Sequence, residues 1–303
     1  MRVLKLTGSR SGLMVIDEPL ELSAPLARQL ASRLCRKNPA TGESCEWNHG
    51  FWQYLRILGL AASPKRQADF YREAFEQLAD SSGRPRILIS GAADYGMLAL
   101  VLGAFRERDI EPEITVVDVC ETPLALNRWF AERESVQIHT HCSDLLSYTS
   151  EVPFDLICTH SFLAYFIPAR RPALLANWHT LLRPGGAVVT VNPIRPASPC
   201  EPTRFTPAQA EAFCAAALKR ATEMRSGLDI EPEEALRGAQ ITVRQRGFYS
   251  VTSLEEIRSL FEQAGFIMQR LFSALLIAGA DPEVSGLGTS GSTNYAHIIA
   301  VRE

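Results

Sequence analysis

A glycine-bearing turn and an aspartate follow two apolar runs of the chain, and both could contact a small ligand. The turn Gly91–Gly96 comes directly after the apolar run Arg86–Ser90 and before a helix-like segment. Small residues there let the backbone approach a ligand closely, and the N-terminus of a helix favours a negative group. Asp118 ends the next apolar run, where a carboxylate is the usual acceptor for two ribose hydroxyls. The two features together predict a nucleoside-containing ligand.

Polar residues also follow the third and fourth apolar runs. Asp144 could accept a hydrogen bond from the exocyclic amine of adenine, with Leu145 packing beside the ring. His160 follows the run Phe154–Thr159, and Tyr165 lies shortly after it. An imidazole suits the role of general base because its pKa lies near neutrality. His160 is therefore a candidate base.

Short apolar runs that alternate with helix-like segments must position these residues. Such alternation predicts βαβ units and a doubly wound parallel sheet of the α/β class. The later part predicts a final hairpin across the glycine-rich segment Gly279–Thr293, so the last strand should be antiparallel. The expected strands are Arg86–Ser90, Ile114–Asp118, Val136–Thr140, Phe154–Thr159, Ala187–Asn192, Ile241–Tyr249, Phe266–Leu276 and Tyr295–Val301. The expected helices after residue 84 are Met97–Arg108, Pro123–Arg133, Ala169–Leu182, Pro207–Met224 and Leu254–Ala264.

Residues 1–80 differ in texture and predict helices only. Leucines at helical spacing run from Leu20 to Leu34, with Ser23 as the expected N-cap. Two further helices are expected over Phe51–Leu60 and Pro64–Ala79, after a polar loop at Asn38–Gly50. We expect two parts: a helical segment over 1–80 and an α/β domain over 81–303, the latter with an insertion at about 195–250.

The motifs RILISGAADYG, ITVVD, CSDLL, FDLICTHSF and LLRPGG follow one another in this order. Over about residues 84–303 the series resembles the class I S-adenosylmethionine-dependent methyltransferases. The resemblance implies a seven-stranded Rossmann-like sheet whose last strand is antiparallel, with S-adenosylmethionine as cofactor. It implies His160 and Tyr165 as catalytic residues near the transferred methyl group. The cofactor-binding residues that it implies are Gly91, Ala92, Ala93, Gly96, Asp118, Val119, Asp144, Leu145 and His160.

The same resemblance gives the two additions a role. Helical additions commonly form a lid over the site in small-molecule methyltransferases, so residues 1–80 are expected to be a lid and 195–250 a cap. Trp52 or Tyr54 could line the pocket beneath them, where an aromatic face would attract a sulfonium cation.

The turn departs from the family pattern at several positions. Members commonly carry an acid two residues before the first glycine and then glycines at alternate positions. Here those positions read Ile89, Gly91, Ala93 and Tyr95. Asp94 is a candidate replacement for the missing carboxylate.

Composition excludes several other classes of function. The net charge is −3, so no basic field points to nucleic acid or to an anionic membrane. The segment Thr159–Phe162 (THSF) also lacks the [ND]PP[FYW] signature of relatives that methylate nucleobases or glutamine. No apolar run is long enough to span a membrane, and the first residues do not read as a signal peptide. The seven cysteines are scattered without CxxC spacing, which predicts no metal site and a reducing, cytoplasmic location.

We therefore expect a methyltransferase that acts on a small molecule, in secondary metabolism. Two alternatives remain. The altered turn would suit a cyclase of the same fold, which forms azetidine-2-carboxylate or a similar product from the cofactor and releases methylthioadenosine. A cofactor-binding protein without catalysis is the other. The sequence names neither an acceptor nor an oligomeric state.

Overall fold

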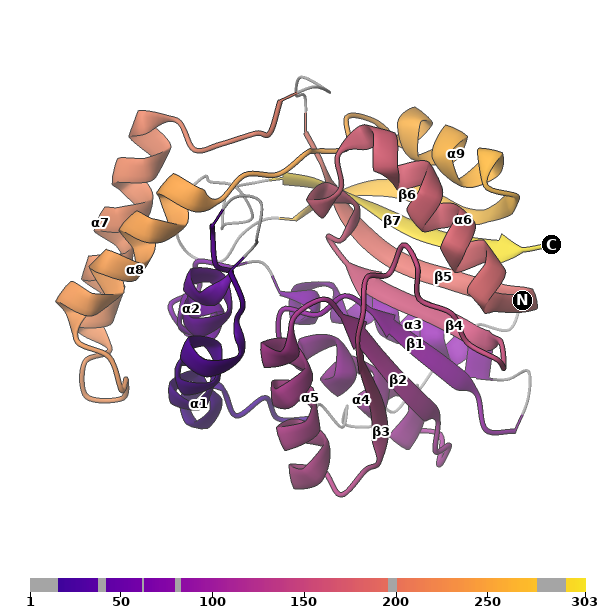
Figure 1. Ribbon diagram of the computed structural model, residues 1–303, viewed down its shortest axis with the longest axis horizontal. Coiled ribbons are helices and arrows are strands. Elements are labelled where there is room, and N and C mark those ends of the chain that lie inside the picture. Colours follow the sequence, from indigo (N-terminus) through magenta and orange to yellow (C-terminus); the bar gives the residue numbers. More distant parts are fainter. Residues whose placement is uncertain (1–15, 38–41, 62, 80–82, 196–200, 277–292) are drawn as a thin grey trace, which may run out of the picture.

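A twisted seven-stranded sheet forms the centre of the computed structural model (Figure 1). The structure describes residues 16–303 except 38–41, 62, 80–82, 196–200 and 277–292. The strand order is β3-β2-β1-β4-β5-β7-β6, with β1 to β5 parallel and β7 antiparallel to both of its neighbours. The predicted fold class and the antiparallel last strand are thus confirmed. The strands are β1 Arg86–Ser90, β2 Glu113–Asp118, β3 Ile138–Cys142, β4 Phe154–His160, β5 Leu182–Ile194, β6 Phe266–Leu276 and β7 Thr293–Arg302.

Helices cover both faces of this sheet. The helices α4 Gly96–Arg106 and α5 Glu121–Arg133 pack on one face, and α6 Arg171–Leu181 and α9 Leu254–Gln263 pack on the other. The strands β1, β2, β4 and β5 read as nearly continuous apolar runs because both of their faces are buried.

The expected boundary near residue 80 does not coincide with a boundary in the core. The first three helices are α1 Leu20–Leu34, α2 Glu46–Ile57 and α3 Ala68–Ala79. On α3, the side chains of Phe70, Tyr71 and Phe75 are buried in the same cluster as β1, α4 and α5. Helix α3 is therefore part of the layer that covers the sheet, and α1 also contributes Ala27 to the same cluster.

Helices α1 and α2 pair with a second addition far along the chain. The helices α7 Pro207–Glu223 and α8 Pro232–Gln245 pack beside α2, as Figure 1 shows at its left edge. The strand expected over Ile241–Tyr249 is wrong, because α8 continues to Gln245 and only an isolated bridge at Phe248 follows it. Ala235, Ala239 and Thr242 lie at helical spacing on α8 and are all buried, so the helical period decides the conformation there.

Two smaller differences concern the ends of elements. The first helix begins at Leu20, so Ser23 is buried inside it rather than capping it. Helix α2 begins at Glu46, inside the expected loop Asn38–Gly50. The expected loop Gly279–Thr293 lies almost entirely outside the described residues. Among the residues that the structure describes, no helix is long and apolar enough to cross a membrane.

Candidate functional site

A cavity of about 710 Å³ lies at the carboxyl ends of the parallel strands. Sites for small molecules typically occupy roughly 300–1,000 Å³, so this cavity has room for a cofactor together with a small second ligand. Its wall combines the turns after β1, β2, β3 and β4 with residues of α2 and of the segment after α8. The residues of those four turns that line it are Gly91, Ala92, Ala93, Asp94, Asp118, Val119, Cys120, Asp144, Leu145, Leu146, His160, Ser161 and Phe162.

The turn after β1 can only be made with glycine at position 91. Gly91 has φ +74°, and a Cβ there would lie 2.3 Å from the ring of Phe162. An L-residue would meet backbone strain and this ring together. The Ala92 amide then donates to Asp118 Oδ2 at 2.9 Å, which joins the ends of β1 and β2 at the cavity wall.

Asp118 sits where a carboxylate can accept further hydrogen bonds. Its Oδ1 accepts from the Cys120 amide at 2.8 Å, and its Oδ2 accepts from Ala92. Each oxygen of an ionised carboxylate can accept about two hydrogen bonds, so both keep capacity for a ligand. Burial raises the pKa of Asp118, and the two amide donors oppose that shift.

The residues expected to bind the adenine ring differ in their exposure to solvent. Asp144 is exposed and accepts from the Leu146 amide at 2.9 Å, whereas Leu145 beside it is buried. Val119 is 69% exposed although it lines the cavity. Exposed apolar and acidic side chains on one rim suit a flat ring with amine hydrogens.

The second half of the turn is held by the first two helices, although Asp94 also lines the cavity. The Asp94 carboxylate accepts from Arg56 Nη1 at 2.5 Å and from the Gly96 amide at 2.8 Å. The Tyr95 hydroxyl lies 2.7 Å from Ser23 Oγ, and its ring stacks on Phe130. Asp94 and Tyr95 thus hold α2 and α1 against the turn.

Gly96 differs in position from the other predicted cofactor residues. A Cβ at Gly96 would meet Asp94, Glu18 and Arg56 at 3.1–3.3 Å. Gly96 is not among the residues that line the cavity. Its lack of a side chain makes room for the buried pairs that Arg56 forms with Glu18 and Asp94, both at 2.5 Å.

His160 lines the cavity with one ring nitrogen already committed. Tyr71 donates its hydroxyl hydrogen to the Thr159 carbonyl at 2.7 Å. The Tyr71 oxygen can therefore only accept from His160 Nδ1, 3.0 Å away. This assigns the hydrogen to Nδ1 and leaves Nε2 bare and buried, with no partner among the described residues. Burial, and then the charges of His297 and Arg56, lower the pKa of His160 to about 3.

A buried arginine in the wall was missed by the sequence analysis. Arg246 is 4% exposed, and its Nε and Nη1 have no hydrogen-bond partner among the described residues. Its guanidinium lies 5.2 Å from the ring centroid of Trp52 and 4.9 Å from that of Phe248. Burial lowers the pKa of Arg246, and Tyr165 raises it. Nothing in the sequence distinguishes this arginine from the exposed ones of α8.

The two aromatic residues considered for the pocket have different surroundings. Trp52 lines the cavity. Tyr54 is buried between α2 and the second addition, and its hydroxyl donates to the Asp229 carbonyl at 3.2 Å. Tyr165 lines the cavity but is 52% exposed, with its ring edge-on to Phe248. It therefore lies at the mouth.

Part of the chain is similar to a known protein family. Residues 99–186 match a family model described as a methyltransferase domain. This part of the chain, from α4 into β5, therefore resembles a methyltransferase domain. The class I family that the sequence motifs resemble uses S-adenosylmethionine as its cofactor. No curated protein matches the chain.

Several solved structures resemble this chain at low identity. TehB from Haemophilus influenzae is 13% identical with a TM-score of 0.48; the match covers 75% of this chain and 60% of TehB. Magnesium protoporphyrin IX methyltransferase from Synechocystis, with bound SAM, is 12% identical with a TM-score of 0.47, over 84% and 85%. A SAM-dependent methyltransferase from Methanosarcina mazei is 15% identical with a TM-score of 0.46, over 73% and 93%.

The cavity fits the cofactor of a methyltransferase domain. The Gly91 cradle would accept a close backbone approach, and the spare acceptor capacity of Asp118 matches two ribose hydroxyls. When bound, S-adenosylmethionine supplies a methyl group on a positively charged sulfur. The residues present would hold its adenosine part at the turns after β1, β2 and β3.

Proposed function

We propose that this protein transfers the methyl group of S-adenosylmethionine to a small molecule that carries an anionic group. One observation carries this proposal. Arg246 has hydrogen-bond donors with no partner among the described residues, and it lies in the wall of an otherwise mainly apolar cavity. A buried guanidinium without an anion is costly, because burial penalises a charge that nothing compensates. A carboxylate or phosphate on the acceptor would accept from Nε and Nη1 and remove that cost.

The surroundings of Arg246 support an acceptor that is anionic and flat. Arg195 also lines the cavity, and burial lowers its pKa while the nearby positive Arg246 lowers it further. Two arginines near each other favour an anion between them. Trp52 and Phe248 flank the guanidinium, and such rings provide faces for an aromatic or other planar body.

The reaction itself needs alignment more than charge. The nucleophilic atom of the acceptor gives its electron pair to the methyl carbon, and the carbon–sulfur bond breaks with its pair left on sulfur. The acceptor then loses one proton, and the second product is S-adenosylhomocysteine. A mainly apolar cavity favours this step because water competes poorly there and the reacting atoms are held in line.

We assign His160 the role of orienting the acceptor. A base with a pKa of about 3 is neutral throughout the physiological range and accepts a proton poorly. Its bare Nε2 can still accept a hydrogen bond from a hydroxyl or amine and so point the lone pair of that group at the methyl carbon. Tyr165, at the mouth, would cover the acceptor. This proposal includes a small-molecule substrate of secondary metabolism and a cytoplasmic location.

The altered turn gives the cyclase alternative no support. Asp94 and Tyr95 are committed to Arg56 and Ser23, so their unusual types follow from packing against α1 and α2. The product distinguishes the two reactions. We expect S-adenosylhomocysteine when the protein is incubated with S-adenosylmethionine and a metabolite extract, measured by mass spectrometry. Methylthioadenosine would show the cyclase reaction instead, and no product from any extract would overturn the proposal.

Arg246→Met tests the anionic acceptor. It should raise the KM of the acceptor about 10- to 100-fold, the loss expected for one or two charge-assisted hydrogen bonds, and leave the Kd of S-adenosylmethionine unchanged. Arg244→Met is the matched control, because Arg244 is exposed two residues away on α8. Equal KM values for the two variants would refute the role of Arg246.

A further inference from the structure

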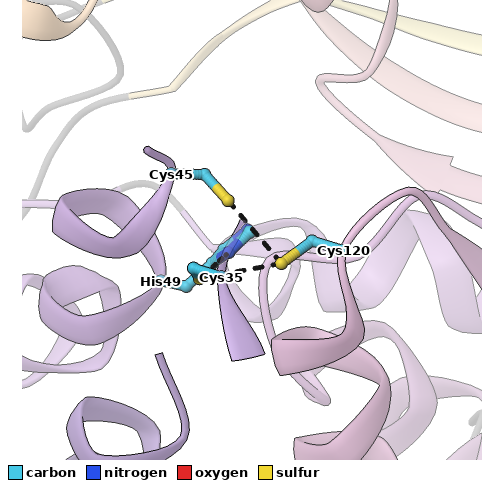
Figure 2. A group of neighbouring side chains, drawn as sticks. All are labelled: Cys35, Cys45, His49 and Cys120. Atoms are coloured by element: carbon cyan, nitrogen blue, oxygen red, sulfur yellow. Dashed lines mark hydrogen bonds between the residues drawn. The ribbon is translucent and has the colours of Figure 1, made fainter. Parts of the chain in front are cut away.

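Three cysteines and a histidine meet at the wall of the cavity, beside Asp118. Cys35, Cys45, His49 and Cys120 direct their side chains toward one another (Figure 2). Their four ligand atoms all lie within 4.8 Å of one another. The sequence analysis expected no metal site, because these residues are spread over three segments of the chain. We propose that they bind one zinc ion as a Cys₃His site.

The distances fit a tetrahedral ion. Zn–S bonds of about 2.3 Å and a Zn–N bond of about 2.1 Å, at tetrahedral angles, put sulfurs about 3.8 Å and sulfur and nitrogen about 3.6 Å apart. The Sγ atom of Cys120 lies 3.7 Å from that of Cys35 and 3.6 Å from that of Cys45. Cys35 Sγ lies 3.4 Å from His49 Nδ1. The cluster is therefore close to the size that the ion requires before any rearrangement.

The elements that carry the four ligands are held by contacts of their own. Cys35 caps the end of α1, and Cys45 caps the start of α2 one helical turn before His49. A backbone bridge between Lys37 and Ser44 brings the two ends together. Cys120 is the N-cap of α5 and follows the turn that Asp118 fixes. The one sequence signal was the spacing Cys45–His49, which puts both side chains on one face of a helix.

The ligand types select zinc and a structural role. Thiolates with imidazole suit zinc better than the oxygen-preferring magnesium or calcium. Four protein ligands complete a tetrahedron and leave no open position for substrate. A disulfide would use only two of the three sulfurs and would leave the third thiol and the imidazole without partners. The Thr122 hydroxyl, 3.1 Å from Cys35 Sγ, is placed to stabilise a thiolate there.

A metal here would connect the helical addition to the cofactor turn. Three ligands come from α1, α2 and their connection, and the fourth comes from the residue two positions after Asp118. Binding of the ion would then hold the Asp118 turn in one conformation and close the wall of the cavity at the same place. We expect loss of the metal to weaken cofactor binding without removing any cofactor contact.

Metal content tests the site independently of any methyl transfer. The full-length protein, purified without chelators and with reductant, should contain about one zinc per chain by plasma mass spectrometry. After exchange, Co²⁺ should give the intense visible bands and sulfur-to-metal charge transfer of a tetrahedral thiolate site. Cys120→Ser and His49→Gln should each lower the zinc content at least tenfold. Cys214→Ser, on α7 and outside the cluster, should keep it.

The outcomes separate cleanly. A wild-type protein that binds neither zinc nor Co²⁺ with this spectrum overturns the proposal. So does a Cys35–Cys120 or Cys45–Cys120 disulfide found by peptide mapping of protein purified anaerobically. If Cys120→Ser proves insoluble, the milder His49→Gln and titration of wild-type thiols with and without chelator decide, because bound thiolates react slowly until the metal is removed.

Discussion

Asp118 carries the most specific expectation at the scale of a single residue. Replacing it by alanine removes a charged acceptor for two ribose hydroxyls, so Asp118→Ala should weaken S-adenosylmethionine binding by about 1.5–3 kcal/mol. Asp144→Ala should cost less, because Asp144 is exposed. Isothermal calorimetry measures both, with Asp109→Asn, remote from the cavity, as control. A larger loss for Asp144 than for Asp118 would show that the adenine and ribose ends are assigned to the wrong turns.

His160 gives the protein a pH dependence of stability with a definite sign. Its folded pKa of about 3 lies below the unfolded value near 6.5. His160 therefore binds a proton more readily in the unfolded state than in the folded state. Its contribution to the free energy of unfolding is fully present above about pH 6.5 and is lost as the pH falls toward 3. At pH 5 the loss is about 2 kcal/mol.

The variant His160→Gln should remove this part of the pH dependence. Urea unfolding between pH 7.5 and 5 would measure it, with His139→Gln, an exposed position on β3, as control. In the same range, kcat should show no rise with pH that depends on His160, because its imidazole is already neutral. A kcat limb near pH 6.5 that disappears in His160→Gln would restore the general-base role.

The packing of α8 on α2 is the feature to test at the scale of elements. A Cβ at Gly238 would lie 2.6 Å from the ring of Phe51. Alanine gains up to about 1 kcal/mol of helix propensity, but overpacking costs about 1–3 kcal/mol. Gly238→Ala should therefore lower stability by about 1 kcal/mol and, by moving the end of α8, impair the acceptor site. Gly227→Ala, whose Cβ would meet nothing nearer than 3.8 Å, should do neither.

The sequence predicted the elements of the sheet well because their signals are local. Three of the five parallel strands, β1, β2 and β4, begin or end where the apolar runs do, since a strand buried on both faces reads as a continuous run. It failed at α8, where Ile241 and Val243 suggested a strand although the helical face beginning at Ala235 continued. It also missed Arg246 and the cysteine cluster, because their surroundings are assembled only by packing between distant segments.

At the scale of the whole molecule, α3 decides what can be removed. A chain that starts at residue 81 loses Phe70, Tyr71 and Phe75 from the core. Each large aromatic side chain contributes about 3–5 kcal/mol when removed from a core, and a domain has about 5–15 kcal/mol in total. We therefore expect this truncation to be insoluble or to lack a cooperative melt by circular dichroism. A chain that starts at residue 63 keeps α3 and should therefore retain more of the folded sheet. A cooperative melt of the chain that starts at residue 81 would contradict this expectation and show that α3 belongs to the lid.

The pairing of α2 with α7 and α8 also has a consequence for synthesis on the ribosome. The apolar face of α2, with Phe51 and Leu55, is covered by residues such as Phe213 and Ala239. Translation proceeds at about 5–20 residues per second, so this face emerges roughly ten to thirty seconds before its partner exists. During that interval the nascent chain presents an uncovered hydrophobic helix, which is the kind of surface that chaperones bind. Slowing translation between residues 60 and 210 should therefore lower the yield of folded protein more than slowing it after residue 250.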